Sequence, residues 1–158
     1  MAHQIDTFSI GRASYASTKR EWHGLGELMQ PNEPIEVWAQ AAGMEYEVQR
    51  GYVRYATARG QTAEQMQVVK DKVVLFRSDT GAPLGVVSDS YKVVQPREVL
   101  EFFRGWADAG GVSIESAGVL FGGKRYFATA KLGEGVFVDG QSDKVVPYAL
   151  LSLSLIHI

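Results

Sequence analysis

The sequence predicts an α+β domain in which a largely antiparallel β-sheet packs against one main amphipathic helix and a shorter one. Two observations predict this class. Short runs of β-branched and aromatic residues, separated by glycine-containing turns, occupy most of the 158 residues. Only two segments show the apolar spacing of a helix, and the strands come in groups rather than alternating with helices.

The main helix is expected over residues 96–109. Pro96 suits its first turn, where a missing N–H costs nothing, and Gly110 and Gly111 end it. Apolar residues recur at helical spacing, at Val99, Phe102, Phe103, Trp106 and Ala107. A helix with this much aromatic surface needs a sheet to cover.

The shorter helix is expected over residues 33–42. Asn32 is a suitable N-cap, Pro34 lies in the first turn and Gly43 ends the helix. Its apolar face is expected at Ile35, Trp38, Ala41 and Ala42.

The strands are expected on both sides of the main helix. Before it, a hairpin turns near Arg50 and Gly51, and residues 73–76 pair with 84–87 across an Asp-Thr-Gly-Ala-Pro turn. After it, further strands are expected at 112–120, 124–132, 136–138 and 145–155, with a tight turn at Gly122 and Gly123.

Composition narrows the class of protein. The chain has no cysteine, which excludes disulfides and thiolate metal sites, and its net charge of −2 argues against a surface coated in basic charge for duplex DNA. No signal peptide and no membrane-spanning apolar run are present, so we expect a protein without a membrane partner. We expect a single domain over 1–158, with residues 1–18 as a loosely held N-terminal segment.

No catalytic constellation is visible, so we expect a protein that is not an enzyme and uses no cofactor. The histidines are scattered, and a Ser–His–acid site would have to use His23. No metal-ligand spacing occurs. Asp79 and Asp89 are better explained as turn and loop residues than as paired carboxylates. A Gly-x-Gly at Gly24 and Gly26 lacks the strand and third glycine of a phosphate loop.

Cations interleaved with tyrosines suggest single-stranded DNA binding instead, because such sites combine a basic groove with aromatic faces for stacking. The candidate nucleic-acid-binding residues are Arg77, Tyr91, Lys92, Lys124, Arg125 and Tyr126. A second interleaved set is Tyr52, Arg54, Tyr55 and Arg59. The alternative explanation is that the tyrosines are ordinary strand residues and the cations lie on solvated faces.

A third possibility is a structural or protein-interaction module that forms a homo-oligomer through its edge strands. The Val145-Val146 run and the apolar C-terminal strand favour it. Salt separates the two hypotheses, because nucleic-acid binding weakens with salt and apolar edge association does not.

Several blocks together resemble a known family. They are Trp22-His23-Gly24-Leu25-Gly26, Arg77-Ser78-Asp79-Thr80-Gly81, Leu84-Gly85-Val86-Val87, Tyr91, Val94-Gln95, Ala117-Gly118-Val119-Leu120, Gly122-Gly123-Lys124-Arg125 and residues 143–151. In this order they are similar to the phage/plasmid-like family called domain of unknown function 932, over about residues 22–151.

The resemblance implies a bacterial cytoplasm and a role near mobile DNA, but no established reaction. The α+β pattern is also similar, by analogy only, to phage single-strand annealing recombinases. Members usually continue beyond the strand that matches 148–151. We therefore expect a truncated member of the family in which residues 152–158 form a non-native tail.

Overall fold

The structure is a computed structural model of the whole chain, and it describes residues 14–15, 27–30, 33–108, 111–138 and 143–155. The helical elements are α1 (Ile35–Ala41), α2 (Pro96–Asp108) and the short 3₁₀ turn η1 (Phe121–Gly123). The strands are β1 (Ser14–Tyr15), β2 (Glu27–Leu28), β3 (Val48–Tyr55), β4 (Gln67–Arg77), β5 (Pro83–Ser88), β6 (Val112–Leu120), β7 (Arg125–Leu132), β8 (Val136–Val138), β9 (Asp143–Val145) and β10 (Tyr148–Ser154).

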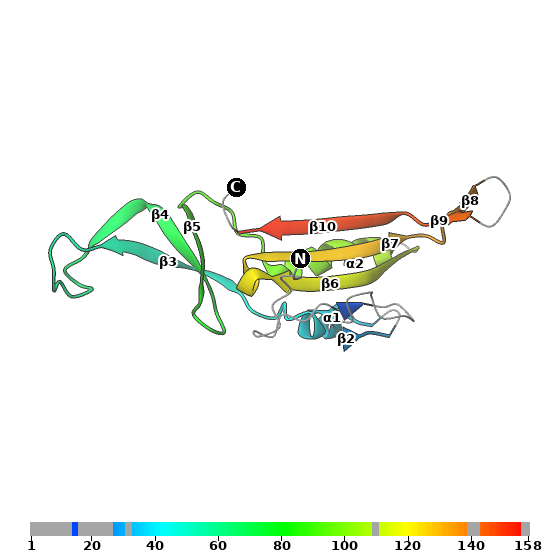
Figure 1. Cartoon of the computed structure of the whole chain (residues 1–158), viewed down its shortest axis with the longest axis horizontal. Coiled ribbons are helices and arrows are strands. Elements are labelled where there is room, and N and C mark those ends of the chain that lie inside the picture. The colour runs from blue at the N-terminus through cyan, green and yellow to red at the C-terminus, as the bar shows by residue number, and fades with distance from the viewer. Residues whose placement is uncertain (1–13, 16–26, 31–32, 109–110, 139–142, 156–158) are drawn as a thin grey trace.

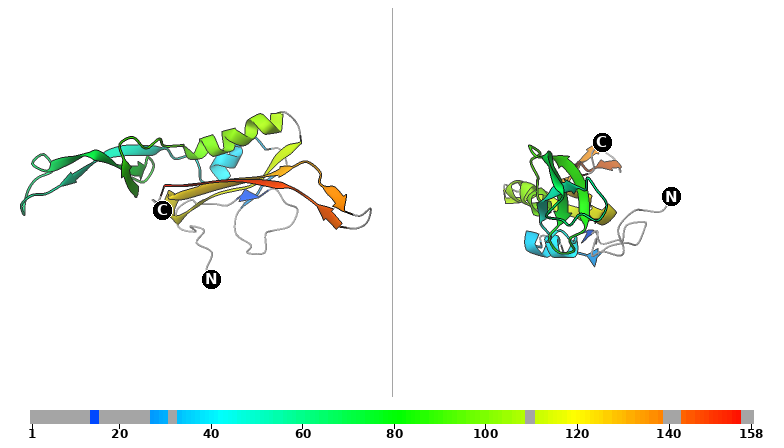
Figure 2. Two further views of the ribbon diagram at one scale, coloured as in Figure 1. Left: turned by 90° about the horizontal axis from the view of Figure 1, so that it is seen from above. Right: turned by 90° about the vertical axis from the view of Figure 1, so that its left-hand side faces the viewer.

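The strands form three sheets arranged along one long axis (Figure 1). The central sheet has the order β10-β7-β6-β1-β2, and α1 and α2 lie on the same face of it (Figure 2). A three-stranded sheet, β3-β4-β5, extends from one end, and the small β8–β9 hairpin projects from the other (Figure 1). All pairings except β1–β2 are antiparallel. The predicted α+β class with its two helices is therefore confirmed.

The core lies between α2 and the central sheet. Val99, Leu100 and Phe103 of α2 are fully buried, and the sheet meets them with small residues, since Ala117 of β6 is directly opposite Ala128 of β7. Alanines at these positions leave room for the helix to approach closely, and close packing of apolar side chains is the main favourable term in folding. The aromatic helix predicted from periodicity thus covers a sheet, as expected.

The segment 46–55 does not form the predicted hairpin. It runs as one strand, β3, through Gly51 and pairs with β4 from Val48 to Tyr55. Gly51 continues the strand without a turn: it pairs with Val74 of β4, and a Cβ on Gly51 would be 3.1 Å from Val74 Cγ1 and 3.4 Å from Phe76 Cε1. An aromatic ring across the ladder compensates for the missing side chain of a strand glycine.

Two other expectations differ in detail or lie outside the described residues. The predicted last strand, 145–155, is divided into β9 and β10, with Pro147, which cannot donate to a ladder, between them. The predictions for most of residues 1–18, for the motif 22–26, for the helix stop at Gly110 and for residues 156–158 fall outside the described residues. The predicted cap at Asn32 is wrong, because α1 begins at Ile35 and its N-cap is Pro34.

Candidate nucleic-acid interface

Of the sequence-predicted residues, Arg77 lies where the three-stranded sheet meets the central sheet, at a place that we call the junction. It consists of Tyr46, Arg77, Asp79, Gly122 and Gly123. The Tyr46 hydroxyl donates to the Gly123 carbonyl at 3.0 Å, and Arg77 Nη1 donates to the Gly122 carbonyl at 3.3 Å. Gly123 has a φ of +102°, and a Cβ there would lie 3.0 Å from the Tyr46 hydroxyl. Glycine is required at this position by both conformation and space.

Arg77 is a structural residue of the junction. Its side chain is almost fully buried, and Nε and Nη2 donate to the two Asp79 carboxylate oxygens at 2.9 and 2.7 Å. Its guanidinium also lies 4.0 Å from the centre of the Tyr46 ring, a cation–π contact. The prediction that Arg77 contacts a DNA strand is therefore corrected, because a side chain held in this way cannot reach a ligand at the surface.

The pKa of the Asp79 carboxyl is held below its ordinary value, chiefly by the hydrogen bonds from Arg77, against the opposing effect of burial. Because the folded-state pKa is the lower one, the pair stabilises the fold above the ordinary aspartate pKa of about 4 and loses this effect as the pH falls through the folded value. We expect the free energy of unfolding, measured in urea at pH 7, 5, 4 and 3, to fall toward acid.

Two aspartate variants test this prediction, and the second of them is the matched control. Asp79→Asn should flatten the decline between pH 5 and pH 3, whereas Asp89→Asn, on an exposed loop, should leave it unchanged. A decline of equal size in wild type and in Asp79→Asn would contradict the assignment of this ion pair.

Tyr126 is also structural. The side chain has no exposed surface, and its hydroxyl donates to the Val94 carbonyl in the loop before α2. Burial raises the pKa of Tyr126 well above its usual range and that of Tyr46 to about 12, so both phenols remain neutral hydrogen-bond donors. The predicted stacking role of Tyr126 is corrected for this reason: no face of the ring is open to a base.

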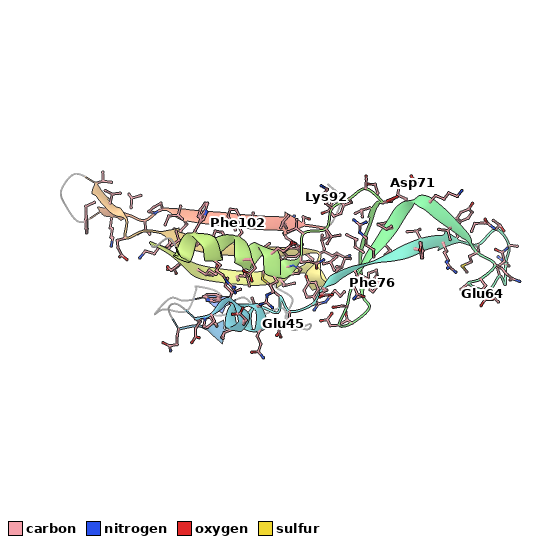
Figure 3. All side chains as sticks on the ribbon, turned by 180° about the vertical axis from the view of Figure 1, so that it is seen from behind. Glu45, Glu64, Asp71, Phe76, Lys92 and Phe102 are labelled. Atoms are coloured by element: carbon pink, nitrogen blue, oxygen red, sulfur yellow. The ribbon has the colours of Figure 1, made fainter. Side chains whose placement is uncertain are left out.

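The other four predicted residues keep some exposure. Tyr91, Lys124 and Arg125 are half-buried, whereas Lys92 is exposed. Lys92 lies in the loop between β5 and α2, at the base of the three-stranded sheet (Figure 3). Arg50 of β3 holds this loop, since Nη1 donates to the Asp89 carbonyl at 3.2 Å and Nη2 donates to the Tyr91 carbonyl. Lys92 is therefore fixed next to the strands that extend beyond it.

Those strands carry the largest concentration of exposed cations and tyrosines. We call residues 49–72 the arm: most of β3, the first half of β4 and the turn between them, with Glu64 at its tip (Figure 3). The arm contains five basic and two acidic residues, a net charge of +3 in a chain whose total is −2, so the remainder carries −5. Tyr52 and Tyr55 are 74% and 53% exposed.

The sequence pattern identified only half of the arm. Tyr52, Arg54, Tyr55 and Arg59 were recognisable as an interleaved set along one segment. Lys70 and Lys72 were missed because they belong to the partner strand, β4, which comes next to β3 only through the register that pairs Arg54 with Val68 and Tyr52 with Val73. The run of three charged residues at 70–72 was the only sign in the sequence that this strand is exposed.

Side-chain hydrogen bonds order the tip of the arm. Gln61 Oε1 accepts from the Thr57 N–H at 2.7 Å, and Arg54 Nη1 donates to the Ala63 carbonyl at 2.7 Å. The Thr62 N–H donates to Gln65 Oε1 at 3.0 Å, which is one half of a capping box. An ordered turn keeps the arm extended and its cations in place.

No described helix is long and apolar enough to cross a membrane. Among the described residues, no group of three or more acidic or histidine side chains is placed to bind a metal ion.

Comparison with known proteins gives one match. Residues 83–154 match the family described as a domain of unknown function, DUF932, which confirms the resemblance over this segment. The matched segment begins at β5 and ends with β10, so it includes α2 and most of the central sheet but not the arm. No curated protein and no solved structure matches the chain.

Proposed function

We propose that this chain, whose residues 83–154 belong to the domain of unknown function 932, binds single-stranded DNA along its arm. The observation that supports the proposal is the arm itself, a projecting hairpin with a net charge of +3 and two largely exposed tyrosines in a chain that is otherwise acidic. In the phage and plasmid setting that the resemblance implies, such binding would serve recombination or replication of a mobile element in the bacterial cytoplasm, without catalysis.

The chemistry of the arm favours a single strand over a duplex. Lysine and arginine attract phosphates of either, but exposed aromatic rings gain energy only from unpaired bases, by stacking at about 1–3 kcal/mol per base. Tyr52 and Tyr55 offer such rings, and Arg54 lies between them in β3. The remainder of the chain, with a net charge of −5, repels phosphate, so electrostatics directs a strand to the arm and to Lys92 at its base.

The test is fluorescence anisotropy of a labelled single-stranded oligonucleotide, titrated with the full chain over a salt series. We expect affinity to fall steeply with salt, with a log–log slope near −0.7 per phosphate contacted. Arg59 and Lys70 form no ion pair with any described residue, so Arg59→Glu with Lys70→Glu should change charge without breaking the fold. This double variant should lower affinity at least about tenfold and reduce the slope.

Two matched controls identify the arm as the site. Lys144→Glu reverses one charge at the opposite end of the molecule and should have little effect. Tyr52→Ala should weaken binding about 5- to 150-fold, whereas Tyr148→Ala, at a tyrosine of β10 that is 57% exposed, should not. The proposal fails if the folded chain does not bind the oligonucleotide at low salt, or if duplex of the same length binds equally well.

The second candidate function is a protein-interaction module that forms a homo-oligomer. It is favoured by the β8–β9 hairpin, where Val136, Phe137, Val138 and Val145 are 69%, 62%, 55% and 55% exposed. A contiguous patch of exposed apolar side chains commonly marks an interaction surface, because monomeric proteins rarely expose large ones.

A further inference from the structure

β10 is the edge strand of the central sheet that is most open to another strand. It pairs with β7 from Tyr148 to Ser154 without a bulge, and no other described strand lies beside it. Figure 1 shows it along the border of the sheet that is farthest from α1. β10 contains no charged residue and no proline, which are the usual means of protecting an exposed edge. By contrast, β3 carries Arg50 and Arg54, and β5 begins with Pro83.

The hydrogen-bond pattern shows which backbone groups of β10 point outward. The Leu155 N–H donates to the Lys124 carbonyl at 2.7 Å at one end of the ladder, and the Leu132 N–H donates to the Pro147 carbonyl at 2.9 Å at the other. Bonded residues alternate along an antiparallel pair, so the odd-numbered residues of β10 bond to β7. The N–H and carbonyl groups of three even-numbered residues therefore point away from β7. They are Tyr148, Leu150 and Ser152.

Apolar side chains are exposed on both faces of the sheet beside this edge. Because Leu151 packs against the core and successive strand side chains alternate, Tyr148 and Leu150 lie on the face away from the helices. They are 57% and 66% exposed. On the helix face, Phe102 and Trp106 of α2 are 48% and 43% exposed, with their ring centres 5.2 Å apart. Exposed apolar groups that gather in one place commonly mark an interaction surface.

Phe102 and Trp106 lie on the flank of α2 that is directed toward β10. The other flank is held by α1, since Arg97 and Arg104 pair with Glu36 at 2.9 and 2.8 Å. Phe102 and Trp106 come two residues before and two residues after Arg104, which places each of them about 160° around the helix from it. Since α1 lies on the side of α2 away from β10 (Figure 1), the two rings are on the side toward β10.

We propose that two copies of the chain pair through β10, antiparallel and related by a two-fold axis beside Leu150. Leu150 then lies opposite Leu150 of the second copy, and Tyr148 lies opposite Ser152 of the second copy. The outward N–H and carbonyl groups of the two strands bond to each other in this register. The two central sheets join into one continuous sheet with the helices of both copies on the same face.

A second copy is the occupant that this surface favours. A lone peptide strand would cover the edge of β10 but not the rings of Phe102 and Trp106, whereas a second copy brings its own α2, with the same two rings, to that side. Such a contact is isologous, so each strand meets itself, and an uncharged strand brings no like charges together. This inference goes beyond DNA binding and does not depend on it, because the arm takes no part in the contact.

The first test is sedimentation equilibrium of the full chain over a concentration series. Wild type should show a monomer–dimer equilibrium that added salt does not weaken, because the contact is apolar and hydrogen-bonded. Leu150→Lys places two like charges opposite each other and should raise the dissociation constant at least about tenfold. Ser152→Pro should act in the same way, since a proline is tolerated where an edge N–H faces solvent but cannot donate to an added strand. Val86→Lys, the matched control at a valine of β5 that is 54% exposed, should leave the dissociation constant unchanged.

Cysteine cross-linking tests the position of the axis. The chain has no cysteine, so Leu150→Cys introduces a single thiol. The proposed register places its Cα about 5.5 Å from that of its symmetry mate, within the range of a disulfide, so mild oxidation should give a covalent dimer. Tyr148→Cys, on the same strand and face, is displaced from its mate by roughly 13 Å along the strand and should remain unlinked.

Trp106→Gln tests whether α2 takes part, and it should raise the dissociation constant at least about fivefold, since it removes apolar surface from the contact. Circular dichroism should show each variant folded. The inference is overturned if wild type stays monomeric at every concentration, if Tyr148→Cys cross-links as readily as Leu150→Cys, or if Leu150→Lys or Trp106→Gln dimerises as wild type does. Leu150→Lys should bind a single-stranded oligonucleotide as wild type does, so failure of the dimer is distinguishable from failure of DNA binding.

Discussion

Replacing Tyr126 with alanine is expected to lower the free energy of unfolding by about 3–5 kcal/mol, the usual effect of truncating a fully buried aromatic residue. The side chain has no exposed surface and lies in β7, with Val119 of β6 directly opposite. Its removal would leave a cavity in the core, because a close-packed core cannot collapse fully around a gap. Urea denaturation, with linear extrapolation to zero urea, measures the loss.

Two further variants separate the parts of the Tyr126 effect. Tyr126→Phe keeps the ring and removes only the donor to the Val94 carbonyl, so it should destabilise by about 1 kcal/mol. Tyr148→Ala, at an exposed tyrosine of the neighbouring strand β10, should change stability by less than about 1 kcal/mol. If Tyr126→Ala unfolded at the same urea concentration as wild type, the ring would not be part of the core.

Replacing Arg77 with leucine is expected to lower the free energy of unfolding by about 2–4 kcal/mol. Breaking a fully buried ion pair costs about 3–5 kcal/mol, and the effect is smaller here because the Asp79 side chain is 37% exposed and can be hydrated. The substitution also removes the donor to the Gly122 carbonyl and the contact with the Tyr46 ring. Urea denaturation is again the measurement.

Arg97→Leu is the matched control for Arg77. Arg97 lies in α2 with its side chain 55% exposed, and it is paired with Glu36 at 2.9 Å. Surface pairs of this kind contribute about 0–1 kcal/mol, so the change should be small. Equal losses for the two variants would show that the junction is no more important than an ordinary surface ion pair. Single-stranded DNA binding by folded Arg77→Leu should match wild type, because the arm is unchanged.

The candidate residues fall into two groups, one that connects parts of the fold and one that is exposed to solvent. Arg77 connects β4 to η1 and Tyr126 connects β7 to the loop before α2, whereas Lys92 and the arm residues present charge and rings to the solvent. Gln95 contributes to the same connection: its side-chain amide accepts from the Val48 N–H at 2.8 Å and donates to the Val48 carbonyl at 3.2 Å, as a strand partner would. The connection therefore holds β3, and with it the base of the arm, in position.

The sequence alone determined the elements whose residues repeat at a regular spacing. The aromatic periodicity after Pro96 predicted α2, which begins at that proline, and the two apolar runs around Asp79 and Gly81 predicted the β4–β5 hairpin. These predictions succeed because local periodicity and turn chemistry act within a few residues. The Arg50-Gly51 turn was wrong for the opposite reason: β4, which pairs with Gly51 in a strand, comes from a distant part of the sequence.

Only the tertiary structure decided which side chains are available for binding. A sequence shows arginines and tyrosines but not their burial, and Arg77 and Lys92 look equivalent until Asp79, Tyr46 and η1 enclose the first. The arm likewise becomes one basic element only when β4, which carries Lys70 and Lys72, pairs with β3. Burial and cross-strand proximity depend on contacts between residues far apart in the chain, and these exist only in the folded protein.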